Sequence, residues 1–347
     1  MDKKSEVKRL FTSGFKESAE WTDWFFNNVY SNENALIAYD GVQPAACLML
    51  DPYTLKLGET SVDLGYISCC TTTQQYRRRG YMSRLIDEAL REAANRGYAL
   101  ASLIPASERL YFFYDHFGFS TIFYADEQRY TSLHHFQKSE RFVETPPTFE
   151  GFHKLELSHR SVVLHSERDY KNAVDDNAIG RGEHISIADK ESGEPAATLF
   201  ATIGSNAAVV RYILSTSDEA TDSLLAILRE RIGERMIIVW TPPSDEPYFL
   251  KSKGMGRIVN AEKIFEAIAS QFPQTEQTIR IHDNLLPENN GVFIIKHGKV
   301  ERTNSTIRRL TLDVSIETLA KIIFNSRRIG ETFSLPTFRP AMALMLD

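Results

Sequence analysis

The segment from residue 64 to residue 94 constrains the fold of this chain more than any other. It begins with an apolar run, Leu64–Cys70, that is typical of a buried strand, and it continues into a basic loop that ends at Gly80. From Met82 onward, apolar residues recur at the spacing of one helix face. A helix that starts after such a loop offers unpaired amides and the positive end of its dipole, so the segment predicts an anion site suited to a pyrophosphate.

The residues of this loop are suited to phosphate binding. Arg77, Arg78 and Arg79 supply positive charge, and Gly80 allows the backbone to approach the phosphates closely. The alternative is a basic turn that precedes an ordinary surface helix. The loop by itself leaves both interpretations open.

A second informative segment follows. The apolar stretch Leu100–Ile104 predicts a strand, and residues 107–116 predict a helix that leads into Tyr114-Asp115-His116-Phe117-Gly118-Phe119. This run resembles the Tyr-x-x-Phe-Gly-Phe/Tyr motif of the GNAT acetyltransferase superfamily. The loop Arg77-Arg78-Arg79-Gly80-Tyr81-Met82 resembles the acyl-coenzyme A loop of that superfamily, Gln/Arg-x-x-Gly-x-Gly/Ala. An Arg-Arg-Arg-Gly loop with a residue larger than glycine or alanine at the last position is similar to that of the enhanced intracellular survival family.

The resemblance implies that acetyl-coenzyme A is the co-substrate. It places the pyrophosphate on the basic loop and the thioester carbonyl against strand amides near residues 70–72, where a splayed strand leaves donors free. The cofactor-binding residues that it implies are Cys70, Thr71, Thr72, Arg77, Arg78, Arg79, Gly80, Tyr81 and Met82.

Tyr114 is the candidate general acid. When an amine attacks a thioester, the departing thiolate must be protonated, and a phenol with a pKa of about 10 is a suitable donor. The alternative is a core aromatic residue whose hydroxyl reaches the surface.

Trp24, Phe25 and Glu108 are the candidate acceptor-binding residues. In GNAT folds the second helix, here residues 18–30, lines the acceptor pocket, although an aromatic stripe at helical spacing is more often part of a core. Glu108 lies near the proposed acid in the sequence and has the charge to bind an amine. The alternative for Glu108 is a solvated charge on a helix.

The segment 338–347 is apolar, and within it Met342, Leu344 and Leu346 alternate as in a strand. One interpretation is a last strand on a sheet edge. The resemblance implies another, in which the C-terminal carboxylate, here that of Asp347, enters the acetyltransferase site and serves as the base. A carboxylate with a pKa of about 3.5 would act through water, or by orienting and attracting a cationic amine.

The expected fold class is α+β, with tandem GNAT-like domains followed by a sterol carrier protein-like domain. We expect residues 1–140 to form the acetyltransferase domain, 141–250 a second copy without the phosphate loop, and 251–347 the sterol carrier-like domain. A linker is expected at 144–147, and Ser215–Glu219 replaces the loop in the second copy with acidic residues that repel a pyrophosphate. Further strands are expected at 194–203, 207–214, 236–240, 279–283, 291–296 and 309–314, and further helices at 222–232 and 315–323.

Composition narrows the classes of partner. A net charge of −6 over 347 residues gives no sign of nucleic-acid binding and favours cationic partners. Cys47, Cys69 and Cys70 fit no metal spacing, so no metal is expected, and reduced thiols indicate a cytoplasmic protein. No apolar run approaches membrane-spanning length, so no membrane partner is expected. A homo-oligomer is left open.

Two functions follow from these observations. The first is an N-acetyltransferase that moves an acetyl group from acetyl-coenzyme A to a primary amine, by direct attack and without a covalent enzyme intermediate. Its acceptor is a polyamine-like or aminoglycoside-like compound, or a lysine side chain. The second is a non-enzymatic protein that senses acyl-coenzyme A or binds an apolar ligand in the sterol carrier-like domain.

Overall fold

The computed structural model describes residues 2–243, 250–303, 310–325 and 327–346, and it confirms the α+β class. The chain divides into two compact units. Unit 1 contains residues up to 123 together with 253–339, and unit 2 contains residues 124–252 and 340–346. Asp347, the candidate base, lies outside the described residues. The domain boundaries expected at 140 and 250 stay predictions.

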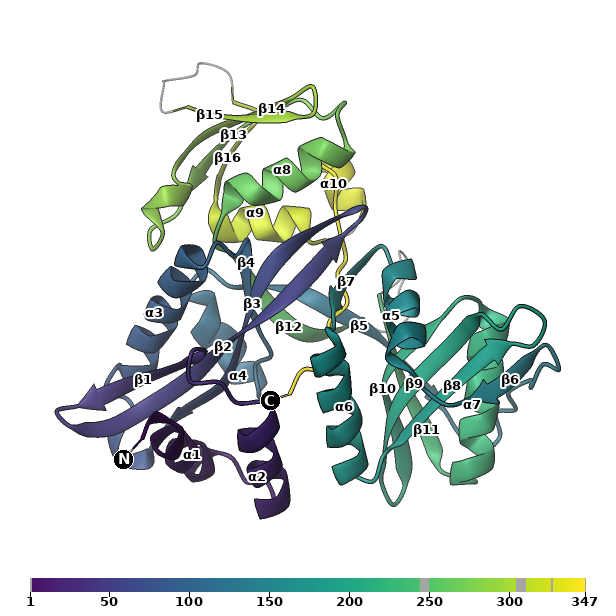
Figure 1. The fold of residues 1–347 in the computed structure, drawn as a ribbon. Coiled ribbons are helices and arrows are strands. Elements are labelled where there is room, and N and C mark those ends of the chain that lie inside the picture. The colour runs from purple at the N-terminus through teal and green to yellow at the C-terminus, as the bar shows by residue number, and fades with distance from the viewer. Residues whose placement is uncertain (1, 244–249, 304–309, 326, 347) are drawn as a thin grey trace. The chain divides into compact units, whose positions relative to one another are not determined.

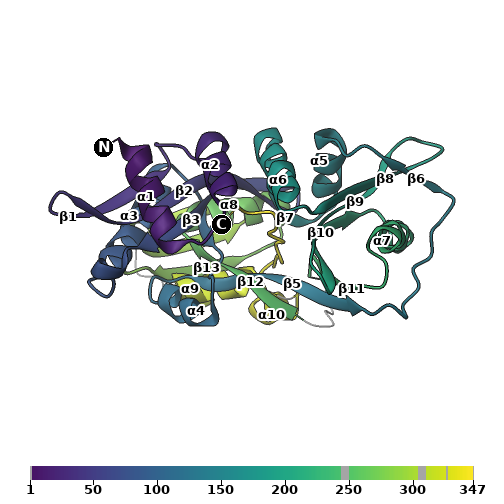
Figure 2. The same cartoon turned by 90° about the horizontal axis from the view of Figure 1, so that it is seen from below.

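The first part of unit 1 is a mixed sheet between layers of helix (Figure 1, Figure 2). Its sheet order is β1-β2-β3-β4-β12-β5. Strands β3 and β4 run parallel, so α3 is the crossover connection between them. The elements are α1 (Lys3–Gly14), α2 (Ala19–Asn28), β1 (Ala35–Asp40), β2 (Gln43–Leu57), β3 (Thr60–Thr72), η1 (Gln74–Tyr76), α3 (Tyr81–Asn95), β4 (Leu100–Leu103), α4 (Glu108–Asp115), β5 (Ser120–Tyr130) and β12 (Leu250–Ile258).

Local sequence accounts for these elements. Gly41 has a φ of 60° in the tight turn that joins β1 to β2 as an antiparallel hairpin. The Ser18 hydroxyl accepts a hydrogen bond from the Trp21 amide at 3.1 Å and begins α2. Leu48 and Leu50 pack in the core beneath α3, and because side chains alternate along a strand, the buried Met49 faces the layer of α1 and α2.

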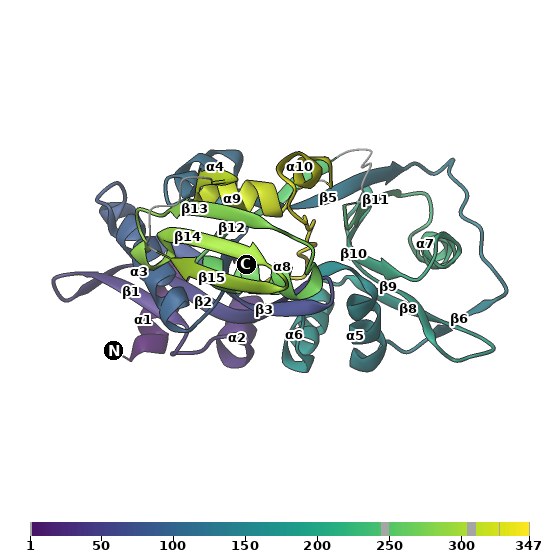
Figure 3. The ribbon, with the colours of Figure 1, turned by 90° about the horizontal axis from the view of Figure 1, so that it is seen from above.

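The second part of unit 1 is a four-stranded sheet of order β15-β14-β13-β16, against which α8 and α9 lie (Figure 3). The strands expected at 279–283 and 291–296 are confirmed, as is the helix at 315–323, where the Ser315 hydroxyl accepts from the Thr318 amide. Residue 309, in the strand expected at 309–314, lies outside the described residues. The elements are α8 (Ala261–Gln271), β13 (Gln277–His282), η2 (Pro287–Asn289), β14 (Gly291–Lys296), β15 (Lys299–Thr303), β16 (Leu312–Ser315), α9 (Ile316–Ile323) and α10 (Arg327–Phe333).

Unit 2 is a sheet of order β5-β11-β10-β9-β8-β6, with α7 on one face and α5 and α6 on the other (Figure 2). The two faces are visible in neighbouring residues of β9, because Leu199 joins the core under α7 whereas Phe200 joins the core with α5 and α6. The elements are β6 (Phe142–Thr145), α5 (Phe149–Ser158), β7 (Ser161–Leu164), α6 (Glu167–Ile179), β8 (Glu183–Asp189), β9 (Pro195–Ile203), β10 (Ala207–Ser215), α7 (Asp218–Ile232) and β11 (Met236–Thr241).

Unit 2 repeats the order of unit 1. Strands β8, β9 and β10 are antiparallel neighbours, and β10 leads through α7 to a parallel partner, β11, as β3 leads through α3 to β4. The start of α7 differs from that of α3. The Ser217 hydroxyl accepts from the Ala220 amide at 3.1 Å, and Asp218 and Glu219 occupy the first turn. A helix start that is already capped and acidic does not favour a pyrophosphate.

Two local expectations are wrong. Glu144 and Thr145, expected in a linker, belong to β6 and pair with β8. Of the two interpretations of the segment 338–347, the alternating strand is also not formed, since among its described residues only Ala341 makes a bridge, with Val162, and Leu344 has a φ of 55°. The segment is instead held by burial in unit 2, where Ala341 and Leu344 join the core beneath α5 and α6.

Candidate active site

The basic loop and the start of α3 have the geometry of an anion site. Gly80 precedes the first residue of α3 with a φ of 80°, in the left-handed region that favours glycine. A Cβ added to Gly80 would meet no heavy atom within 4 Å, so its backbone faces open space. The amides of the first helical turn lack partners inside the helix and are oriented toward its N-terminal end.

The three arginines of the loop differ in their surroundings, although all are exposed. Arg77 donates through Nε to the Thr72 carbonyl oxygen at 3.1 Å, which ties the loop to the end of β3. Arg79 lies over the ring of Tyr76, with 5.7 Å between its Cζ and the ring centroid. Arg78 has a φ of 62°. The loop is therefore pre-shaped by contacts of its own residues.

Strand β3 carries a β-bulge next to the loop. Met49 of β2 pairs with Ser68, but Cys47 pairs with Thr71, so Cys69 and Cys70 together stand opposite Leu48. Cys69 has a φ of 55°, an uncommon value for a residue with a side chain. Bulges of this kind redirect backbone groups and are frequent beside active sites.

The pairing of β3 with β4 ends before this bulge. The ladder between β3 and β4 consists of the pairs Leu64–Leu100, Gly65–Ala101 and Tyr66–Ser102, whereas β3 continues to Thr72. The stretch of β3 that contains Cys70, Thr71 and Thr72 therefore runs beyond its pairing with β4. The residues whose amides the family resemblance assigns to a thioester carbonyl lie in this stretch.

Tyr114 lies in the last turn of α4 and is 5% exposed. Its ring makes edge contacts with Phe113 and Phe119, at centroid distances of 5.1 and 6.0 Å. The core cluster that contains Tyr114 also contains Tyr81, and Cys70 and Met82 pack against it. The structure thus brings the aromatic motif, the bulge and the start of α3 together around one core.

The three candidate acceptor residues occupy different environments. Phe25 is 1% exposed and stacks against Phe11, as the packing alternative expects. Trp24 is half-buried, and among the described residues its buried Nε1 has no hydrogen-bond partner. Glu108 is exposed in the first turn of α4. Trp24 is therefore the aromatic residue of this set with an unused donor.

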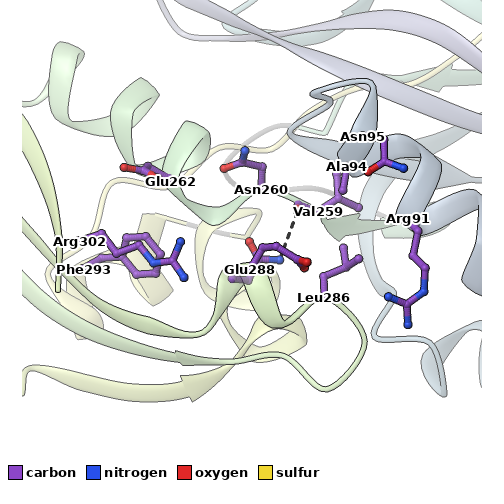
Figure 4. A pocket seen from close by; sticks show the side chains of 11 residues that line it. Arg91, Ala94, Asn95, Val259, Asn260, Glu262, Leu286, Glu288, Phe293 and Arg302 are labelled. Atoms are coloured by element: carbon purple, nitrogen blue, oxygen red, sulfur yellow. Dashed lines mark hydrogen bonds between the residues drawn. The ribbon is translucent and has the colours of Figure 1, made fainter. Parts of the chain in front are cut away.

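A cavity of about 400 Å³ lies elsewhere in unit 1, between the C-terminal half of α3 and the sterol carrier-like part (Figure 4). Arg91 lines it from α3, Glu262 from α8, Glu288 from η2 and Arg302 from β15. Apolar walls come from Val259, Leu286 and Phe293. A lining that carries both signs of charge does not offer the continuous apolar wall that a sterol-like ligand favours.

Sequence reasoning missed the buried pair Arg257 and Asp283, whose Nη2 and Oδ1 atoms are 2.7 Å apart. The available signal was an arginine within the largely apolar run at 255–259. A charged side chain in a buried strand needs a partner in the core. No group of histidine, cysteine and acidic side chains in the described part of the chain has the geometry of a metal site.

Two parts of the chain match models of known protein families. Residues 2–122 match the acetyltransferase (GNAT) domain model, and residues 261–335 match the sterol carrier protein domain model. No curated protein matches the sequence. In the described part of the chain, no helix is long and apolar enough to cross a membrane.

Several solved structures share the fold. A probable N-acyltransferase from Enterococcus faecalis is 15% identical, with a TM-score of 0.81, and the match covers 99% of this chain and 97% of the other. Eis1 from Mycobacterium abscessus is 16% identical, with a TM-score of 0.72 and coverage of 96% and 92%. A GCN5-related N-acetyltransferase from Anabaena variabilis is 17% identical, with a TM-score of 0.77 and coverage of 97% and 96%.

Proposed function

We propose that this chain, in which residues 2–122 match a GNAT acetyltransferase domain and residues 261–335 a sterol carrier protein domain, transfers the acetyl group of acetyl-coenzyme A to a primary amine by direct attack. The observation that carries the proposal is the shared core of the bulged strand, the start of α3 and Tyr114. Donors for a thioester, a cradle for phosphates and a phenol are the groups that this reaction requires.

The loop residues fit the pyrophosphate of the co-substrate. Gly80 leaves open space in front of the unpaired amides of α3, and Arg78 and Arg79 are exposed beside it. Arg77 holds the loop to β3 through the Thr72 carbonyl and adds its charge. Bound acetyl-coenzyme A supplies the activated acetyl group, and amides near Cys70 donate to the thioester oxygen where negative charge develops.

Proton transfers complete the reaction. The amine nitrogen forms a bond to the acetyl carbon, the carbon–sulfur bond breaks with its electrons on sulfur, and Tyr114 gives its hydroxyl proton to the thiolate. The nitrogen loses a proton, for which we propose the α-carboxylate of Asp347, through water, as the acceptor. Glu108 and the chain's net charge of −6 attract a cationic acceptor, and the indole N–H of Trp24 is available to donate to an oxygen atom of that molecule.

The test is release of free thiol from acetyl-coenzyme A with a panel of amines: a polyamine, an aminoglycoside and a lysine-containing peptide. We expect release that requires both the protein and one class of amine, with the acetylated amine identified by mass. The competing non-enzymatic function predicts binding of acetyl-coenzyme A by calorimetry and no thiol release with any of the three classes.

Replacing Gly80 with valine is expected to weaken acetyl-coenzyme A binding at least tenfold, or about 1.4 kcal/mol. A branched side chain is strained at a φ of 80°, and it would stand where the phosphates approach. Calorimetry on the purified variant gives the dissociation constant.

The matched control is Gly193→Val in unit 2. Gly193 has a φ of 71° and, like Gly80, an added Cβ there meets nothing within 4 Å. The control variant therefore carries similar backbone strain outside the basic loop. It should bind acetyl-coenzyme A with the dissociation constant of the intact protein. Equal affinities for the two variants would remove the loop from the co-substrate site.

A further inference from the structure

Arg257 is a fully buried arginine on β12 whose hydrogen bonds reach two other segments of unit 1 as well as its own strand. It is 2% exposed. Its Nε donates to the Phe117 carbonyl oxygen at 2.6 Å, its Nη1 to the Ile258 carbonyl oxygen at 3.1 Å, and its Nη2 to Asp283 Oδ1 at 2.7 Å. The guanidinium thus joins the Tyr-x-x-Phe-Gly-Phe motif to the sterol carrier protein domain.

The Asp283 carboxylate also has several hydrogen-bond donors around it. Besides Arg257, its carboxylate accepts from the Leu285 and Leu286 amides, each at 3.0 Å, and from Asn289 Nδ2 at 2.9 Å. Asn289 in turn donates to the Val259 carbonyl and accepts from the Ala261 amide. Because these donors hold the Asp283 carboxylate in one position, the carboxylate in turn holds the Arg257 guanidinium in position.

The motif is shaped to meet this arginine. Gly118 has a φ of 79°, and a Cβ added there would lie 3.1 Å from Arg257 Nε. A side chain at position 118 would therefore be strained and would crowd the guanidinium. A second hydrogen bond to the sterol carrier protein domain comes from Ser120, two residues after Gly118. The Ser120 hydroxyl donates to the Glu317 carbonyl oxygen at 3.1 Å. The turn that follows Tyr114 is therefore connected to the sterol carrier protein domain indirectly, through Arg257 and Asp283, and Ser120 adds a direct contact.

The path from Arg257 to the candidate acid is short. The Tyr114 carbonyl oxygen accepts from the Phe117 amide at 3.0 Å, and the Phe117 carbonyl accepts from Arg257. Helix α4 has only eight residues, a length at which a helix depends on tertiary contacts for its position. Its last turn, which carries Tyr114, is held by the turn that Arg257 binds.

We propose that Arg257, held by Asp283 of the sterol carrier protein domain, is the positioning residue that places Tyr114 for proton transfer. This inference rests on the proposed function, in which Tyr114 is the acid. It gives the sterol carrier protein domain a part in catalysis that needs no ligand. A well-packed apolar pair could stabilise the fold as well as this ion pair does, but it could not donate to the Phe117 carbonyl.

The test compares a double variant with the intact protein. Arg257→Met alone leaves a buried carboxylate unpaired and can unfold the domain, so Asp283→Asn is added to remove the second charge while keeping an oxygen for the Leu285 and Leu286 amides. We expect a folded double variant whose dissociation constant for acetyl-coenzyme A is unchanged. Its single-turnover rate should fall at least tenfold, since misplacement by about 1 Å can cost as much as 10²-fold.

Two further measurements separate positioning from stability. Arg257→Lys retains the positive charge but loses the planar guanidinium. Its single-turnover rate should lie between those of the double variant and the intact protein. The ion pair of Arg211 and Asp176 in unit 2, at 3.1 Å, supplies the control variant Arg211→Met/Asp176→Asn, which should keep its rate. A double variant of Arg257 and Asp283 that is folded and turns over at the full rate would overturn the proposal.

A further set of variants separates the positioning role of Arg257 from the assignment of Tyr114 as the general acid. In a Tyr114→Phe background the Arg257→Met/Asp283→Asn change should have little additional effect on the rate, because the group that it positions is gone. Full and independent effects of both changes would show that Arg257 acts on something other than Tyr114. A Tyr114→Phe protein with an unchanged rate would instead remove Tyr114 from the mechanism, and the proposal with it.

Discussion

Tyr114→Phe is expected to lower the single-turnover rate of acetyl transfer by about 10²- to 10⁴-fold, the usual contribution of a general acid. The substitution removes only the hydroxyl. The ring contacts with Phe113 and Phe119 and the backbone hydrogen bond from the Phe117 amide do not involve it. Binding of acetyl-coenzyme A should therefore stay close to that of the intact protein.

The control is Tyr111→Phe, which removes a hydroxyl from the same helix one turn earlier. Both rates are measured by rapid quench under enzyme excess, so that product release does not mask the chemical step. A full rate for Tyr114→Phe, with chemistry shown to be rate-limiting, would assign Tyr114 to packing.

Extension of the chain beyond Asp347 is expected to lower turnover by about 10²-fold or more, if its α-carboxylate takes the proton from the amine nitrogen as proposed. A tag converts that carboxylate into a neutral amide. Asp347→Asn leaves the α-carboxylate in place and should be mild. Deleting residues 346 and 347 should be as severe as the tag, since the new end falls short by up to about 7 Å.

The contacts of residues 341–344 with unit 2 allow an effect on catalysis to be distinguished from an effect on folding. Ala341 donates to the Ser161 carbonyl at 3.1 Å and accepts from the Val163 amide at 2.9 Å, and Leu344 is buried in unit 2. Neither the tag nor the deletion removes these contacts, so thermal melts should change little. The same tag placed before Met1 is the control. A folded, C-terminally tagged protein with full activity would rule out the carboxylate.

The predictable parts of this site are those whose signal is local in sequence. The strand, basic loop and helix at 64–94 combine apolar periodicity with a glycine, and the motif at 114–119 is a contiguous run that resembles a family motif. Both contain a glycine in the left-handed region, Gly80 and Gly118. Helices α5 and α6 were not predicted. Their sequences are less regular, and α6 owes its start to a capping box in which Ser166 and Asp169 bond each other's backbone.

The remaining features depend on partners that are distant in the sequence. The bulge at Cys69 and Cys70 is defined only by the register with β2, which no periodicity in β3 reveals. Arg257 binds a carbonyl 140 residues earlier in the chain. Neighbouring residues carry no trace of such a contact, beyond the presence of a charge in an apolar strand.

The discontinuity of unit 1 bears on how the protein is made. Strand β4, whose four residues are all buried, pairs on one side with β3 and on the other with β12, near the start of the second stretch of unit 1. A growing chain synthesises residues 124–249 before β12 begins, so until then the acetyltransferase sheet has an open apolar edge. Such edges recruit other chains. Nascent chains at this stage are the ones expected to need a chaperone.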